Sequence, residues 1–279
     1  MEKKKAIPEK VYPGEITIDD GNWTEFVNPI VNGEMKVCGT IPRDFHRHPK
    51  GGLPFAAKPF DLPLIPESEW EDRLAEQVKS KAQLSDIRDR SGPNNGPIPS
   101  TDQNGRGYCW CHSGASCLLL VRALNNQPFV DLSAYFVGCI IKGYRDEGGW
   151  GTEGLEFMAK HGMPDSKFWP QRGVKREYDN AETRGNALLH RVEEWMDLPS
   201  RSKPHLVTCL LNNIPVVSDF NWWGHSVCTV DLVSINPFKT RIWNSWGDSW
   251  SSNGMGVLEG SKAIPDDMIA PRVLKASDR

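Results

Sequence analysis

The stretch QNGRGYCWCHSGASC, residues 103–117, brings three cysteines and a histidine to the point where a glycine-rich loop turns into a helix. The small and apolar residues that follow, up to Leu124, are typical of a buried helix. Cys109 stands at the start of this helix, where free backbone N–H groups and the helix dipole stabilise a thiolate. Cys111 falls on a different face and Cys117 lies about two turns further along, so the pattern predicts one presented thiol.

The same spacing argues against a metal centre or a redox pair. Cys109, Cys111 and His112 occur at i, i+2 and i+3, which does not direct three ligands to one tetrahedral site, and the chain contains no CxxC pair. No metal and no cofactor is therefore expected. An isolated cysteine is often simply a small apolar core residue, so the assignment of a nucleophile requires a base elsewhere in the chain.

Length, charge and cysteine content narrow the class of protein. The 279 residues carry a net charge of −3 with no basic patch, so we expect no nucleic-acid partner. No apolar run approaches the roughly 18 residues of a membrane span, so no membrane partner is expected either. The seven cysteines are an odd number, and the basic start MEKKK is not followed by an apolar signal-peptide core. We therefore expect no signal peptide, reduced thiols, and a cytoplasmic or virion-associated protein.

A change in amino-acid composition and apolar periodicity divides the chain into an arm and a domain. Residues 1–66 are rich in Pro and Gly with short apolar pieces, which indicates an extended N-terminal arm, either a structural belt or a divergent prosegment. Helical patterns, including DLSAYFVGCIIKG, TEGLEFMAKHG and NALLHRVEEWM, occupy residues of about 100–200, and β-branched or aromatic runs follow over about 201–260. This order predicts an α+β domain over residues 67–279, with a helical lobe beside a sheet lobe.

Two distant segments supply the partners that a cysteine nucleophile needs. GHSVCTVDL places His225 at the start of one predicted strand, and RIWNSWGDSW places Asn244 near the end of the next. If these strands are antiparallel neighbours, the two side chains meet, and Asn244 orients the imidazole. The pattern therefore predicts a Cys–His–Asn arrangement around Cys109.

These segments resemble the papain-like cysteine peptidases. QNGRGYCW matches the family's Gln-x-x-x-Gly-x-Cys-Trp pattern, GHSV its base segment, and NSWGDSWSSNGMG its Asn-Ser-Trp-Gly stretch. The resemblance implies a two-lobed fold with an active-site cleft between a helical lobe and a β-sheet or barrel lobe. It also implies four catalytic roles: Cys109 as nucleophile, His225 as general base and acid, Asn244 as its orienter, and Gln103 as an oxyanion-hole side chain.

The resemblance extends to residues that would contact a peptide or protein substrate. EGGWGTEGLEFMAKHGM resembles the family's Gly-Gly segment, whose second glycine pairs with extended substrate backbone; here that residue is Gly149. Trp150 and Gly224 are the other positions that the motifs place at the substrate site. Trp246, in the Asn-Ser-Trp-Gly stretch, is implied as a lid over the His–Asn hydrogen bond.

One departure from the family pattern suggests a substitute for a disulfide. The family's usual cysteine three residues before the nucleophile is Arg106 here, and its customary partner aligns with Asp146. We hypothesise that an Arg106–Asp146 ion pair takes the place of that disulfide, which suits a reducing compartment.

Two function classes follow. The complete set of four catalytic residues favours a cysteine endopeptidase, because a disused site tends to lose a member. The Pro-rich arm, without the helical motif of the family's prosegments, favours a structural or assembly protein with an unused site, for example a virion or phage component. In either case we expect the arm to dock on its own domain or inside a larger assembly.

Overall fold

The computed structural model describes residues 10–31, 33–52, 55 and 57–274, so the basic start MEKKK lies outside the described residues. Its main element is a seven-stranded sheet in the order β1-β8-β7-β6-β5-β9-β4, antiparallel except for the parallel pair β1–β8. The strands are β1 (Ile16–Ile18), β4 (Val192–Asp197), β5 (Val216–Phe220), β6 (His225–Ser234), β7 (Lys239–Trp243), β8 (Met255–Glu259) and β9 (Asp267–Leu274). A separate hairpin joins β2 (Ile30–Val31) and β3 (Glu34–Met35).

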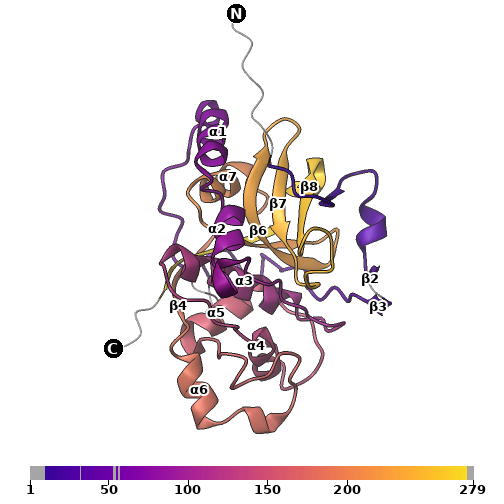
Figure 1. The fold of residues 1–279 in the computed structure, drawn as a ribbon, viewed down its shortest axis with the longest axis vertical. Helices are drawn as coiled ribbons and strands as arrows, with labels where there is room; N and C mark the ends of the chain where they lie inside the picture. The colour runs from indigo at the N-terminus through magenta and orange to yellow at the C-terminus, as the bar shows by residue number, and fades with distance from the viewer. Residues whose placement is uncertain (1–9, 32, 53–54, 56, 275–279) are drawn as a thin grey trace, which may run out of the picture.

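The helices divide between two lobes (Figure 1). They are α1 (Trp70–Ser80), α2 (Leu84–Arg90), α3 (Cys109–Leu124), α4 (Ala134–Ile141), α5 (Gly151–His161), α6 (Ala181–Ala187) and α7 (Lys203–Leu211). Helices α4, α5 and α6 form the lower lobe, while α1 and α7 accompany the sheet. Within the described residues, no helix combines the length and apolar character needed to span a membrane.

Helix α3 lies at the junction of the lobes and is buried from Cys109 to Arg122. It packs on β6, β5 and β9 on one side and on α4 and α5 on the other. Strand β6 is buried on both faces: Cys228 and Val230 belong to the core around α3, whereas Val227 belongs to the core around α7. Because both faces are covered, the polar residues of β6 are buried together with its apolar ones. The expected α+β fold with a helical lobe and a sheet lobe is confirmed.

One expected helix is wrong. NALLHRVEEWM contains the end of α6, a turn, and the strand β4, which pairs antiparallel with β9. The apolar spacing of Val192, Trp195 and Met196 suits either a helix or an irregular strand. The segment forms a strand because it pairs with β9, which is distant in sequence. Register shifts in this pairing accommodate the irregular apolar spacing. The sheet thus extends beyond residues 201–260, since β1, β4 and β9 also belong to it.

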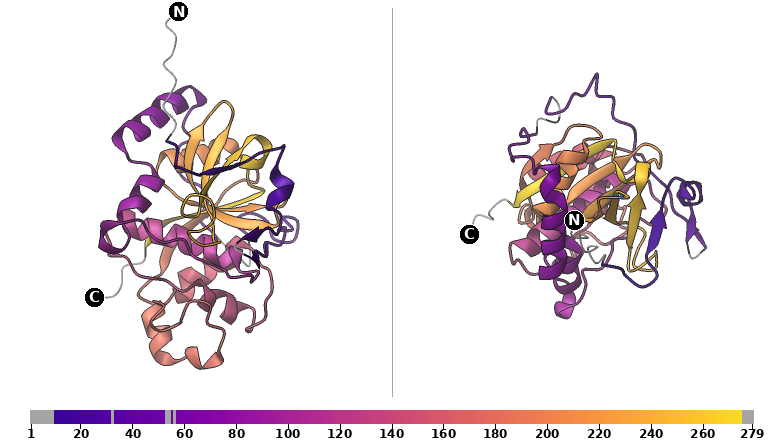
Figure 2. Two further views of the ribbon diagram at one scale, coloured as in Figure 1. Left: turned by 45° about the vertical axis from the view of Figure 1, so that its right-hand side comes forward. Right: turned by 90° about the horizontal axis from the view of Figure 1, so that it is seen from above.

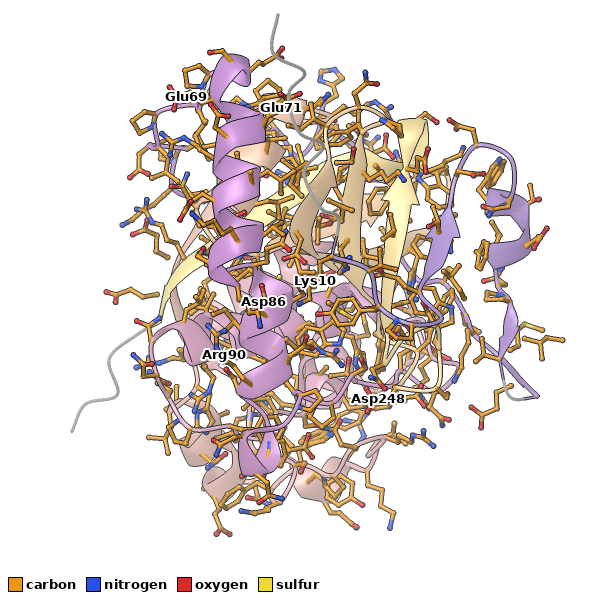
Figure 3. The ribbon with its side chains drawn as sticks, turned by 45° about the horizontal axis from the view of Figure 1, so that its top comes forward. Lys10, Glu69, Glu71, Asp86, Arg90 and Asp248 are labelled. Atoms are coloured by element: carbon orange, nitrogen blue, oxygen red, sulfur yellow. The ribbon has the colours of Figure 1, made fainter. Side chains whose placement is uncertain are left out.

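The arm is anchored at the outer edge of the sheet. Figure 2 shows it running along the sheet lobe, where β1 pairs with β8. Arg241 of β7 is buried between two carboxylates, with its Nε 2.6 Å from Glu15 Oε1 and its Nη1 3.0 Å from Asp231 Oδ2. Lys10 Nζ lies 2.8 Å from Asp86 Oδ1 of α2 (Figure 3). Glu15 and Lys10 both come from the arm, so ion pairs join it to the domain.

Replacing Glu15 tests how strongly this anchor stabilises the fold. The Glu15 side chain is 5% exposed and Arg241 is 1% exposed, so Glu15→Gln leaves a buried guanidinium with one carboxylate partner. We expect the free energy of unfolding in urea to fall by about 3 kcal/mol. The matched control is Glu69→Gln, in the exposed Glu69–Arg73 pair, where the expected change is at most about 0.5 kcal/mol. Equal effects of the two substitutions would contradict this account.

Candidate active site

The residues of the predicted Cys–His–Asn arrangement come from three elements that converge. Cys109 is the first residue of α3, His225 is the first residue of β6, and Asn244 directly follows β7. Strands β6 and β7 are antiparallel neighbours, as expected, and His225 Nε2 lies 2.8 Å from Asn244 Oδ1. Helix α3 is joined to β6 by a 2.7 Å hydrogen bond between the hydroxyls of Ser113 and Ser226. All members of the arrangement are fully buried.

Aromatic rings hold the His225 imidazole in place. Trp246 packs against it with ring centroids 4.7 Å apart and an interplanar angle of 31°, and Trp223 approaches edge-on at 4.8 Å. Trp246 is itself fully buried, so it shields the bond to Asn244 from water. In the described structure, His225 Nδ1 is buried without a hydrogen-bond partner. The ring is therefore fixed by Nε2, which leaves Nδ1 as the nitrogen able to exchange a proton.

The Gln103 side chain is also fully positioned. Its Oε1 accepts a 2.7 Å hydrogen bond from Ser245 Oγ, which directs the amide nitrogen the other way. Nε2 donates to Arg106 O at 2.6 Å and to Val37 O at 2.7 Å. Val37 belongs to the N-terminal arm. A peptide carbonyl of the arm thus occupies the donor that the family resemblance assigns to an oxyanion.

The arm continues from Val37 across the predicted substrate residues; we call residues 37–41 the inserted segment. Gly149 N donates to Gly39 O at 3.0 Å, and Ile41 N donates to Gly149 O at 3.1 Å, which makes a parallel bridge between Thr40 and Gly149. Thr40 N donates to Gly224 O at 2.9 Å. Both glycines predicted to bind substrate therefore bind the backbone of the chain itself.

The inserted segment also covers Cys109. Gly39 N donates to Cys109 Sγ at 3.3 Å, and Thr40 Oγ1 lies 3.4 Å from the same sulfur. A Cβ atom on Gly39 would lie 2.1 Å from Gly107 O, so only glycine allows this close approach of two backbones. Further along the arm, His48 and Phe55 pack on the Trp150 ring, with centroids 4.8 and 5.6 Å away.

Burial works against both charges of a thiolate–imidazolium pair in this covered site. Burial raises the pKa of the Cys109 thiol, although hydrogen bonds from Thr40, Ser226 and Gly39 lower it. Burial lowers the pKa of His225 to about 4, while the hydrogen bond to Asn244 raises it. The family resemblance implies a resting ion pair, but the covered site favours a neutral thiol and a neutral imidazole at neutral pH.

The Arg106–Asp146 ion pair is wrong. Among the described residues, no ion pair joins these side chains; Asp146 Oδ1 instead accepts a 2.9 Å hydrogen bond from Gly107 N. The Arg106 guanidinium lies over the Tyr108 ring, 5.7 Å from its centroid. The loop before Cys109 is therefore joined to the segment around Asp146 by a hydrogen bond between a backbone N–H and a carboxylate. The Asp146 side chain reaches the Gly107 backbone directly.

All seven cysteines are free thiols. Cys117 lies in the core, with its sulfur 3.3 Å from that of Cys228 on β6, and Cys111 is fully buried. Among the described residues, no group of three or more His, Cys, Asp or Glu side chains is placed to hold a metal ion.

Several residues at the site were not identified from the sequence. Ser245 orients Gln103, and its N–H donates to Asn244 Oδ1 at 2.7 Å. Its place inside the Asn-Ser-Trp-Gly stretch was a usable signal, as was the position of Trp223 directly before Gly224. The inserted segment had no such signal, since VCGTI reads only as a short apolar piece of the arm.

Comparisons with known proteins show which solved structures share this fold. No family model matches the chain, and no curated protein does. Among solved structures, xylellain, a cysteine protease from Xylella fastidiosa, is 18% identical, with a TM-score of 0.57 over 86% of this chain and 96% of that one. Procathepsin L 3 from the Tenebrio molitor larval midgut is 15% identical, with a TM-score of 0.54 over 73% and 90%. Bromelain from Ananas comosus is 17% identical, with a TM-score of 0.52 over 62% and 93%. The chain therefore has the papain-like fold.

Acidification tests the environment of His225. Its pKa is about 4 in the folded protein and ordinarily 6.5, so between these values only the unfolded chain binds the proton. The stability due to neutral His225 is therefore complete above this window and is lost as the pH falls through it. We expect His225 to contribute a slope of about 1.4 kcal/mol per pH unit.

The measurement is urea denaturation at several pH values across the window. His225→Gln should remove this part of the slope, whatever it does to absolute stability. His46→Gln, at an exposed histidine, is the matched control. An unchanged slope in His225→Gln, or the same change in both variants, would contradict the assignment.

Proposed function

We propose that the protein is a cysteine peptidase whose active site is covered by its own arm. The observation that carries this proposal is that the groups around Cys109 already bind a peptide backbone. Gln103, Gly149 and Gly224 each hydrogen-bond to a backbone group of the inserted segment. A site that holds extended backbone beside a thiol, an imidazole and an amide donor is suited to attack on a peptide carbonyl. The cysteine proteases among the structural neighbours are consistent with it.

The proposed reaction begins when a substrate replaces the inserted segment. The Cys109 Sγ proton passes to His225 Nδ1, and the sulfur attacks the peptide carbonyl carbon. Gln103 Nε2, vacated by the Val37 carbonyl, and the Cys109 N–H donate to the oxyanion; each such donor contributes about 2.7–4 kcal/mol to the lowering of the barrier. His225 then protonates the leaving amine. Water, deprotonated by His225, hydrolyses the thioester and restores the thiol.

The inserted segment is held in a way that does not expose it to this chemistry. The nucleophile faces the Gly39 N–H and the Thr40 hydroxyl. The sulfur therefore accepts a hydrogen bond from the Gly39 N–H, which directs its lone pair toward the amide proton and away from the adjacent carbonyl carbon. The segment therefore acts in this proposal as an internal inhibitor.

The rival function is a structural or assembly protein with an unused site. The covered, uncharged thiol favours it, as does the buried anchor of the arm. The two functions differ in whether Cys109 becomes reactive once the inserted segment is displaced.

The Gly39→Ala variant distinguishes the peptidase from the structural or assembly protein without altering a proposed catalytic side chain. The added methyl group would collide with the Gly107 backbone, and overpacking of this kind costs about 1–3 kcal/mol. We expect a thiol-reactive epoxide to label Cys109 at least about tenfold faster in the full-length variant than in the wild type. Intact-mass and peptide mapping measure the label. Gly185→Ala is the matched control, since a Cβ there meets nothing within 4 Å.

Cys109→Ala tests the nucleophile. Gly39→Ala should hydrolyse peptides from a random library, and Cys109→Ala in the same background should abolish turnover. Cys38 is a second thiol near the site, where burial and the charge of Cys109 raise its pKa, but it belongs to the inserted segment that is displaced. Undiminished hydrolysis in the double variant would refute Cys109 as nucleophile. Limited proteolysis reports whether the inserted segment is displaced in Gly39→Ala. If it is displaced and the variant shows neither labelling of Cys109 nor hydrolysis, the rival function is favoured.

A further inference from the structure

Beyond the inserted segment, the arm enters a buried cluster of charges that the proposed chemistry does not use. Arg43 donates from Nη1 and Nη2 to the two oxygens of Asp197, at 3.1 and 3.0 Å, and its Nη1 lies 3.5 Å from Asp267 Oδ2. Lys50 Nζ lies 3.0 Å from Asp197 Oδ1 and also pairs with Asp267. The Arg43 side chain is 1% exposed.

The carboxylates of this cluster belong to the sheet, whereas its cations belong to the arm. Asp267 on β9 is directly opposite Asp219 on β5, and both are only 2% exposed. Asp197 ends the neighbouring strand β4. In the described part of the chain, the cations that contact these carboxylates are Arg43 and Lys50. If the arm leaves, the sheet therefore retains three buried acids without a cation.

The acids lie next to the residues that bind peptide backbone. Gly151 N donates to Asp219 Oδ2 at 3.1 Å, and Gly151 is two residues beyond Gly149. Asp219 is also opposite Ser226, the neighbour of His225, in the β5–β6 ladder. On the arm, Arg43 follows three residues after Thr40, which bridges to Gly149. A peptide held at Gly149 can thus place a side chain among the acids.

Asp219 has acceptor capacity that the arm leaves unused. Its Oδ1 atom is buried and has no hydrogen-bond partner in the described structure. Burial and the charge of Asp267 raise the pKa of Asp219 to about 7, while the Ser226 hydroxyl, the Gly151 N–H and the charge of Lys50 lower it. A buried carboxyl with an open acceptor is costly unless a donor reaches it. Among the described residues, these carboxylates are not arranged as a group that could hold a metal ion.

Resting on the proposed peptidase function, we propose that Asp197, Asp219 and Asp267 form a specificity pocket for a basic side chain of the substrate. Arg43 and Lys50 occupy this pocket in the covered state. A substrate arginine restores the charge balance that the departing arm removes, whereas an acidic or apolar side chain leaves the carboxylates unpaired. Arginine is preferred to lysine, because its planar guanidinium matches two carboxylates at once, as Arg43 does.

The test uses the full-length protein with Gly39→Ala and Arg43→Gln, which uncovers the site and removes the guanidinium from the pocket; Lys50 remains as the cation that a substrate side chain must displace. Fluorogenic peptides carry Arg, Lys, Gln, Leu or Glu at one position at a time around the scissile bond. At one position we expect kcat/KM for Arg to exceed that for Gln by about 10–100-fold. Glu should be the poorest residue at the same position. This measurement leaves all three acids in place.

Asp267→Asn in the same background should reduce the Arg-to-Gln ratio by about tenfold. Because Arg43 is already neutralised, this substitution removes a charge that has lost one partner, which is milder than breaking an intact buried pair. Asp266→Asn is the matched control: the Asp266 carboxylate pairs with Arg201, at 2.7 Å, outside the pocket, so this substitution should leave the ratio unchanged. Asp219→Asn, which retains an acceptor for Gly151 N, gives a second pocket variant if Asp267→Asn does not fold.

The outcomes distinguish this inference from the function on which it rests. Cleavage without a basic preference at any position overturns the pocket and leaves the peptidase. A basic preference that persists in the Asp267 and Asp219 variants overturns the assignment of these residues. No cleavage of any peptide, together with no labelling of Cys109, overturns the proposed function and the pocket with it.

Discussion

The burial of α3 between the sheet and the helical lobe is the constraint on which the site depends. Because the helix is covered along nearly its whole length, its first residue, Cys109, has a fixed position relative to β6. Strand β6 begins with His225, and its antiparallel pairing with β7 delivers Asn244 to the imidazole. The ring is then enclosed by Trp246 and Trp223. A helix packed less completely would leave the thiol without a defined relation to the base.

Desolvation connects the geometry of the inserted segment to the chemistry of the site. Burial is the main cause of both the raised pKa of Cys109 and the lowered pKa of His225. Displacing residues 37–41 admits water, which removes that cause and favours the charged forms of both groups. The same event frees Gln103 Nε2 from Val37 O. In the proposed function, uncovering the site therefore supplies access, the donor for an oxyanion and the thiolate form of the sulfur together.

The arm is held by two clusters of different character. At the sheet edge, Glu15 pairs with the buried Arg241, so this part of the arm completes the domain itself. Around the site, the contacts are backbone hydrogen bonds and the Arg43 and Lys50 ion pairs, which a peptide with a basic side chain can reproduce. The structure thus favours local displacement of the segment near the site over loss of the whole arm, because loss would also break the Arg241 anchor.

The local sequence predicted the buried helix after residue 103 and the late strands, because helix periodicity and strand composition are properties of neighbouring residues. It also predicted that His225 and Asn244 meet, because the two strands that carry them are consecutive in the chain. It misassigned NALLHRVEEWM, where pairing of β4 with the distant β9 overrides a helical pattern. It also could not show that Gly39 lies on Cys109 or that Arg43 and Lys50 meet Asp197 and Asp267. These contacts join segments far apart in the chain, and nothing in the composition of either segment specifies the other. Only the packed tertiary structure decided that residues 37–41 of the chain cover Cys109.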